Sequence, residues 1–142
     1  MTTQEEQFIN ENDSQGFEEV EGIKTNKQGK LYVSNPYLLK EILKSKEQDE
    51  LTPAALKMFD LMIKNISQKK YYNNPEDRKD CQQSAFVDIL MYWRGFDPEK
   101  NPNAFAYYTS MIINGLNKGW GKCAGKLKTS EIVSLDNNIH SI

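Results

Sequence analysis

The residues best suited to chemistry lie in one basic, aromatic stretch between Lys100 and Lys128. This stretch has no Asp or Glu, and its five lysines are interleaved with tyrosines, a tryptophan and asparagines. Lysines can neutralise phosphates, aromatic rings can stack on unpaired bases, and side-chain amides can read base edges. We expect these contacts from Tyr107, Tyr108, Asn114, Lys118, Trp120 and Lys122. The pattern is compatible with nucleic-acid binding, although composition alone favours an ordinary solvated helix with core tyrosines.

No arrangement of residues is typical of catalysis. His140 is the only histidine, it lies in no sequence context typical of a Ser or Cys nucleophile, and no glycine-rich phosphate loop is present. Cys81 and Cys123 form no metal-ligand pattern, so we interpret them as a helix-packing thiol and an exposed thiol. We therefore predict a protein that is not an enzyme and that needs no metal or cofactor.

Acidic charge is concentrated at the N-terminus. The first 22 residues contain seven acidic residues and no Lys or Arg, which leaves 13 acidic against 18 basic residues, about +5, in the remainder. A segment of this composition cannot offset its own ordering entropy, so we predict an acidic, largely disordered arm over residues 1–33. Because no membrane span or signal peptide is apparent, we expect a soluble intracellular protein with reduced thiols.

The placement of proline predicts where the helices begin. Four dipeptides match an N-cap residue followed by proline at the first helical position: Asn35-Pro36, Thr52-Pro53, Asn74-Pro75 and Asn101-Pro102. The predicted helices run over about 36–47, 53–68, 75–94 and from 102 onward. Four glycines from Gly115 to Gly125 predict that the last helix frays after about Gly119.

The helical pattern predicts an all-α protein, a compact bundle of about four helices over residues 34–128. The apolar run AFVDILMYW in the third helix predicts that this helix lies between the others. Ile23 to Val33 is compatible with a short strand or turn. We interpret residues 129–142 as a flexible C-terminal tail with apolar points.

The order of two motifs resembles a known family. DCQQSAFVDILMYWRGFD (80–97), a short loop and NAFAYYTSMIINGL (103–116) are similar to region 2 of bacterial sigma factors. There, a helix ending in Phe-Asp leads into a Phe-x-x-Tyr-Ala-Ser helix. Matching residues here are Phe96 and Asp97, then Phe105, Tyr108, Thr109, Ser110, Ile113 and Gly115. The likeness is closer to the late sigma factors of T-even-type phages and their marine relatives, which are also small, and it covers about residues 34–128.

The resemblance implies surfaces that bind RNA polymerase. In the family, the helix before Phe-Asp docks on the clamp helices of the largest subunit of core polymerase. The corresponding residues are Asp80, Gln83, Ser84, Phe86 and Leu90. For Phe86 and Leu90 the alternative is that they only fill the hydrophobic core. Late phage sigma factors also use a C-terminal apolar motif on the flap of the second-largest subunit, a role open to Leu135, Ile139 and Ile142. A phage coactivator or sliding clamp is a further expected partner.

The resemblance also implies that the following helix melts and reads the minus-ten promoter element. Family members flip bases out of the non-template strand, and Tyr107 is the better stacking platform because Tyr108 matches a position that is often buried. Asn114 and Lys118 are one helical turn apart and are expected to face duplex DNA. Met111 is also assigned to this DNA-facing set. With Ile112 it replaces the tryptophan pair of housekeeping sigma factors, so the usual aromatic wedge is absent.

The function that these observations favour is a sigma factor for phage late genes in the cytoplasm of an infected bacterium. Such a protein would bind core RNA polymerase, recognise an AT-rich minus-ten-like element and hold the open strand, with no membrane partner. The alternative is a polymerase-binding coactivator or modulator that does not contact DNA. A free-standing repressor is a third reading, disfavoured by the absence of a helix-turn-helix sequence.

Overall fold

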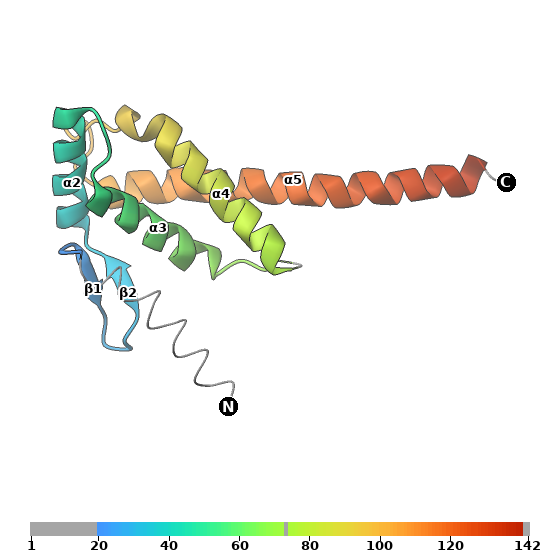
Figure 1. The fold of residues 1–142 in the computed structure, drawn as a ribbon, viewed down its shortest axis with the longest axis horizontal. Helices are drawn as coiled ribbons and strands as arrows, with labels where there is room; N and C mark the ends of the chain where they lie inside the picture. The colour runs from blue at the N-terminus through green and yellow to red at the C-terminus, as the bar shows by residue number, and fades with distance from the viewer. Residues whose placement is uncertain (1–19, 73, 141–142) are drawn as a thin grey trace.

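Four α-helices and one β-hairpin make up the described part of the chain (Figure 1). The computed structural model describes residues 20–72 and 74–140, with side chains up to Cys123. Residues 1–19, which hold most of the predicted acidic arm, lie outside the described residues. In chain order the elements are β1 (Ile23–Thr25), β2 (Leu31–Val33), α2 (Asn35–Gln48), α3 (Pro53–Ser67), α4 (Pro75–Tyr92), a 3-10 turn (Trp93–Gly95) and α5 (Ala104–His140). The prediction of a helical bundle of about four helices is confirmed.

The hairpin corrects the predicted extent of the arm. β1 and β2 pair antiparallel with Ile23 opposite Val33, and both side chains are buried. The side-chain amide of Asn65 on α3 donates a hydrogen bond of 2.9 Å to the Leu31 carbonyl, which ties the hairpin to the bundle. The disorder prediction was therefore wrong for residues 20–33, because the apolar side of the hairpin finds a partner surface on α3.

Two of the four predicted helix caps are confirmed. The Thr52 hydroxyl accepts a hydrogen bond from the Ala55 N–H at 3.1 Å, at the start of α3. The Asn74 side-chain oxygen likewise accepts from the Asp77 N–H at 2.8 Å, at the start of α4. Each cap satisfies a backbone N–H that has no partner within the helix. Because cap and amide are only three residues apart, the local sequence is enough to set where these two helices start.

The other two predicted caps were wrong in detail. Asn35 is the first residue of α2 rather than its cap, and its side-chain oxygen accepts a hydrogen bond from the Phe105 N–H of α5 at 2.9 Å. The last helix begins at Ala104, and Asn103 rather than Asn101 caps it, accepting from the Ala106 N–H at 3.0 Å. An Asn-Pro pair marks a helix start, but the tertiary neighbours decide which amide the asparagine reaches.

Helix α5 packs antiparallel along α4 at very short range. A Cβ atom on Gly115 would lie 2.6 Å from the Cα of Ala85, and one on Gly119 would lie 2.8 Å from the Cα of Cys81. No side chain larger than hydrogen fits between these backbones. The glycines that weaken an isolated helix are therefore the residues that allow this contact.

The same contact corrects the predicted fraying. α5 is one helix from Ala104 to His140, so our expectation of fraying after about Gly119 was wrong. Packing against α4 offsets the intrinsic cost of Gly115 and Gly119, about 1 kcal/mol each relative to alanine. Figure 1 shows α2, α3 and α4 gathered around the first half of α5, whose second half, including most of the predicted tail, continues past them.

Alanine substitutions should separate the two effects of glycine on stability: its low helix propensity and the close helix contact that it allows. Gly115→Ala and Gly119→Ala should each lower the free energy of unfolding by about 1–3 kcal/mol, because the new methyl group overpacks the α4–α5 contact. Gly121→Ala is the matched control, since a Cβ there meets nothing within 4 Å, and it should stabilise the protein by about 1 kcal/mol. Urea unfolding of the three variants measures the difference, and equal effects at the three sites would contradict the proposed packing.

Candidate functional site

Tyr108 belongs to the core, which corrects its assignment as a base-stacking residue. Its side chain is fully buried, and its hydroxyl donates a hydrogen bond of 2.7 Å to the Trp93 carbonyl. Its ring meets the Phe59 ring edge-on with centroids 4.8 Å apart. Burial raises the pKa of the Tyr108 hydroxyl well above its usual value. The residue therefore joins α5 to the turn after α4 and is not available to a ligand.

Three of the predicted DNA-facing residues lie together on one ridge of α5. Tyr107, Met111 and Asn114 line a shallow hollow of about 450 Å³ with Asn101 and Ser110. The Tyr107 ring is half-buried and packs against Phe96, with centroids 5.2 Å apart. Of the predicted set, this ridge therefore keeps three residues together: the half-buried Tyr107 and Met111 and the exposed Asn114.

Lys118 continues this ridge but already has a partner. Its ammonium group lies 2.8 Å from a carboxylate oxygen of Asp88 on α4, whose side chain is only 12% exposed. The hydrogen bond to Asp88 raises the pKa of Lys118. A carboxylate so nearly buried needs a cation, so Lys118 neutralises Asp88 and the expectation that its charge is free for phosphate is corrected. Lys122 lies one turn further along and is exposed.

Trp120 does not share the ridge. At about 100° per residue, it lies roughly 140° around the helix from Tyr107, on the side that faces away from Met111 and Asn114. Its side chain is 51% exposed. The predicted DNA-binding set therefore divides into a ridge, a core residue and a residue on another side of α5.

Helix α4 exposes an apolar ridge, although we predicted that it lies between other helices. Only Cys81, Ala85, Asp88 and Ile89 are buried, so the helix has one covered face. The outward side carries four large apolar side chains that are 45–61% exposed: Val87, Leu90, Met91 and Tyr92. The prediction holds in part, since α4 contacts both α5 and α3, but the domain supplies no neighbour for the outward side of the apolar run.

A groove runs beside this ridge between α3 and α4. Its volume is about 700 Å³, and its walls include Leu56 and Ile63 from α3 and Gln83, Phe86 and Val87 from α4. Gln83 is exposed and Phe86 is half-buried, so both predicted polymerase-facing residues reach this groove. Leu90, at 45% exposure, lies on the adjoining ridge, which excludes its purely core alternative. Val87, Leu90 and Met91 together form the α4 ridge.

Two other predicted polymerase-facing residues are on a different side of α4. The Cβ of Ser84 lies where it would meet a Cβ on Gly119 at 3.1 Å, so Ser84 faces α5, which corrects its assignment to the outward surface. Asp80 is exposed beside Asp77 and Cys123 instead of lining the groove. Among the C-terminal residues, Leu135, Ile139 and Ile142 have side chains outside the described residues.

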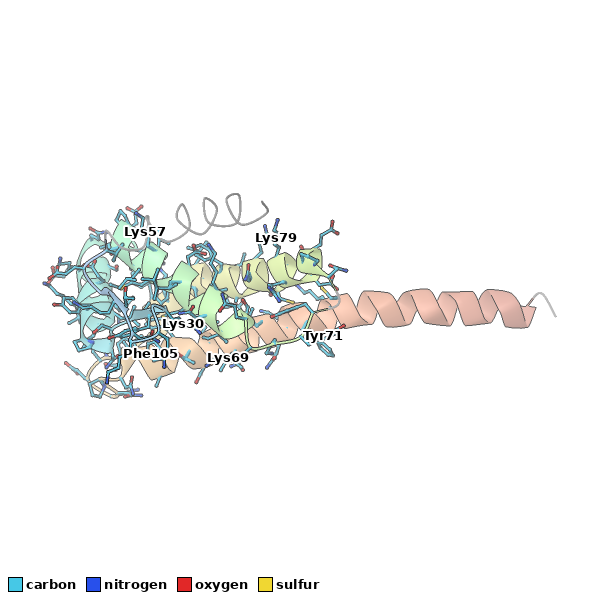
Figure 2. All side chains as sticks on the ribbon, turned by 90° about the horizontal axis from the view of Figure 1, so that it is seen from below. Lys30, Lys57, Lys69, Tyr71, Lys79 and Phe105 are labelled. Carbon is cyan, nitrogen blue, oxygen red and sulfur yellow. The ribbon has the colours of Figure 1, made fainter. Side chains whose placement is uncertain are left out.

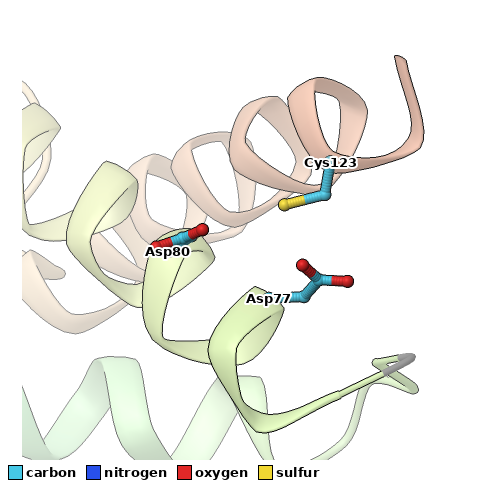
Figure 3. A group of neighbouring side chains, drawn as sticks. All are labelled: Asp77, Asp80 and Cys123. Atoms are coloured by element: carbon cyan, nitrogen blue, oxygen red, sulfur yellow. The ribbon is translucent and has the colours of Figure 1, made fainter. Parts of the chain in front are cut away.

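Asp77, Asp80 and Cys123 form a group that spacing in the sequence did not indicate (Figure 3). Their ligand atoms lie within 4.8 Å of one another, close enough to share a metal ion if one were bound. Partial burial and the carboxylate of Asp77 raise the pKa of the Cys123 thiol. Burial and the neighbouring Cys123 thiol raise the pKa of Cys81 to about 11. Both thiols are therefore held in the protonated, weakly nucleophilic form.

Comparisons with known proteins found none that is similar to this chain. The chain matches no protein-family model, no curated protein and no solved structure. Within residues 20–72 and 74–140, no helix combines the length and apolar composition that a membrane span requires. The inferences about function therefore rest on the residues, the geometry and the motif resemblance described above.

The reactivity of Cys123 should report its acidic neighbours. Asp77→Asn removes a negative charge beside the thiol, so its pKa should fall and its alkylation by iodoacetamide at pH 8 should speed up roughly two- to tenfold. Peptide mass spectrometry distinguishes Cys123 from buried Cys81. Asp60→Asn, on α3, is the control and should leave the rate unchanged. An unchanged rate in Asp77→Asn would contradict the contact.

Proposed function

We propose that this chain is a sigma factor for phage late genes. It is a non-enzymatic subunit that binds bacterial core RNA polymerase and holds an AT-rich minus-ten-like element open in the cytoplasm of the infected host. The observation that carries the proposal is the α4 ridge, an exposed apolar surface on the helix that leads directly into the Phe96-Asp97 turn. That helix is the one that the family resemblance assigns to polymerase.

The α4 ridge has the character of a protein-binding surface. Contiguous exposed apolar side chains are uncommon on monomeric proteins and typically mark a place where another chain docks. Val87, Leu90 and Met91 recur at helical spacing, and the groove beside them accepts side chains from a partner. A long helix of a coiled coil laid along α4 would cover the ridge and fill the groove, which suits the clamp helices of the largest polymerase subunit.

The ridge of Tyr107, Met111 and Asn114 supports contact with promoter DNA. A half-buried ring packed on Phe96 is held in one orientation, so stacking on it costs little side-chain entropy. At the positions of the missing tryptophan pair, Met111 is half-buried and Ile112 is fully buried. In the proposed function, strand opening therefore depends on polymerase and its coactivators more than on an aromatic wedge.

One observation supports the alternative function, a polymerase-binding coactivator that does not contact DNA. Burial of Tyr108 and pairing of Lys118 with Asp88 remove two of the residues expected to contact DNA. The α4 ridge is equally useful to a coactivator. Run-off transcription with core polymerase and an AT-rich promoter separates the two functions: a start-site-specific transcript supports the sigma factor, and tight core binding without one supports the coactivator.

Charged substitutions on the α4 ridge should weaken polymerase binding without unfolding the protein. Leu90→Glu and Met91→Glu should each lower the affinity for core polymerase about tenfold or more, because a carboxylate would be buried in the contact. Leu43→Glu on α2, where the side chain is 42% exposed, is the matched control and should bind like the parent. Surface-immobilised polymerase measures affinity, and circular dichroism checks the fold. Parental affinity in both ridge variants would remove the support for the proposal.

A further inference from the structure

The first turns of α4 carry three side chains that can bind a metal ion on one side of the helix. Asp77, Asp80 and Cys81 occupy positions i, i+3 and i+4, which are neighbours on a helical surface. Cys81 is fully buried, Asp77 is half-buried and Asp80 is exposed. This side of α4 therefore extends from the contact with α5 out to water, which gives a small ion a way in.

Cys123 reaches the same place from α5. Gly119 brings the two helices together, since a Cβ atom there would lie 2.8 Å from the Cα of Cys81. Cys123 follows Gly119 by four residues, so it lies on the same side of α5 one turn further along. Its thiol is in hydrogen-bonding contact with the Cys81 thiol and the Asp77 carboxylate. Two thiols and two carboxylates thus converge from two helices, and Figure 3 shows three of them.

The two carboxylates lack a cation among the described side chains. Neither Asp77 nor Asp80 forms an ion pair there. Arg78 lies over the Tyr72 ring instead, and Lys79 lines the groove between α3 and α4, on the side of α4 that faces away from α5 (Figure 2). Like charges one turn apart on a helix repel, and the helix N-terminus offsets this repulsion only in the first turn. The fold therefore holds two negative charges together without balancing them from its own lysines and arginines.

Cys81 distinguishes this group from an ordinary patch of surface acids. A buried free cysteine usually packs as a small apolar side chain. Cys81 is fully buried and forms no disulfide, but its thiol faces Cys123. Burial, the Cys123 thiol and the carboxylates of Asp77 and Asp80 all raise its pKa. A buried thiol in such surroundings gives up its proton readily only when a positive charge is bound in the same place.

We propose that Asp77, Asp80, Cys81 and Cys123 bind one Zn²⁺ ion. Thiolate ligands favour zinc over magnesium or calcium, and structural zinc sites hold four protein ligands in a tetrahedron. Ligand atoms in such a site are roughly 3.5 Å apart. The ligand atoms of Asp77, Asp80 and Cys123 lie within 4.8 Å of one another, so small side-chain rotations are enough to close the site. On binding, the two thiols release their protons to water.

The ion fastens α5 to α4 at the place where α5 leaves the bundle. Beyond Cys123, α5 continues to His140 past the other helices (Figure 1). A zinc ion at this point fixes the direction of that projecting half. Neither the α4 ridge nor the Tyr107 ridge (Tyr107, Met111 and Asn114) supplies a ligand, so this inference does not depend on the proposed function. The sequence-based prediction of no metal missed the site because two helices distant in the sequence build it.

Cobalt substitution of the full chain under reducing conditions tests the site. Tetrahedral Co²⁺ bound to thiolates gives intense visible bands and a near-ultraviolet sulfur-to-cobalt charge-transfer band, which carboxylates alone do not give. The parent should show these bands with one Co²⁺ per chain, and Zn²⁺ should displace the cobalt and remove them. The absence of a charge-transfer band would overturn the site. So would one Co²⁺ per two chains in a metal-dependent dimer, detected by size-exclusion chromatography.

Two variants assign a thiol and a carboxylate without changing a buried residue. Cys123→Ser and Asp80→Asn should each weaken Zn²⁺ binding, measured by competition with a chromophoric chelator, roughly 10- to 100-fold or more. Cys123→Ser should also lose about half of the charge-transfer absorbance per bound cobalt, because one of two thiolates is gone. Glu76→Gln is the matched control, since Glu76 is an exposed acid in the first turn of α4 outside the group. Parental affinity in both variants, or an equal loss in Glu76→Gln, would contradict the assigned ligands.

Urea unfolding supplies a second measurement. Zn²⁺ should raise the urea midpoint of the parent and leave that of Cys123→Ser nearly unchanged, because a bound ion stabilises only the folded form that holds its ligands together. Circular dichroism of the metal-free variant checks that it folds. A zinc-dependent shift of equal size in the two proteins would mean that the ion binds elsewhere and would overturn the proposal.

Discussion

Gly115 and Gly119 let α5 approach α4 until the two backbones meet at Ala85 and Cys81. This contact decides which sides of the two helices are covered and which remain exposed. It turns one side of α4 inward and leaves Val87 and its apolar neighbours without a cover. A closely packed, rigid pair of helices can present surfaces on opposite sides without their positions shifting relative to each other.

The electrostatic arrangement depends on the same contact. Antiparallel packing brings Lys118 to the nearly buried carboxylate of Asp88, and five residues further along α5 it brings Cys123 to Asp77 and Asp80. The sequence alone does not show that Lys118 has a partner, but in the fold its charge neutralises Asp88. Lys122 on α5, Lys30 in the hairpin and Lys69 after α3 are exposed instead.

In the proposed function, the α4 ridge and the Tyr107 ridge bind partners of different chemistry. The α4 ridge is apolar and suits a protein partner, whose contact gains from removing such surface from water. The ridge of Tyr107, Met111 and Asn114 combines an aromatic ring with a thioether and an amide, which suits the mixed polar and apolar surface of DNA bases.

The sequence by itself determined the helical class and the starts of α3 and α4, because caps such as Thr52 and Asn74 act on amides only three residues away. Only the tertiary structure decided which residues are available to partners. Gln83 and Ser84 are adjacent in the chain, yet one reaches the groove and the other faces Gly119. Which of the two is covered depends on α5, which is distant in the sequence, so the local sequence around Gln83 and Ser84 does not predict it.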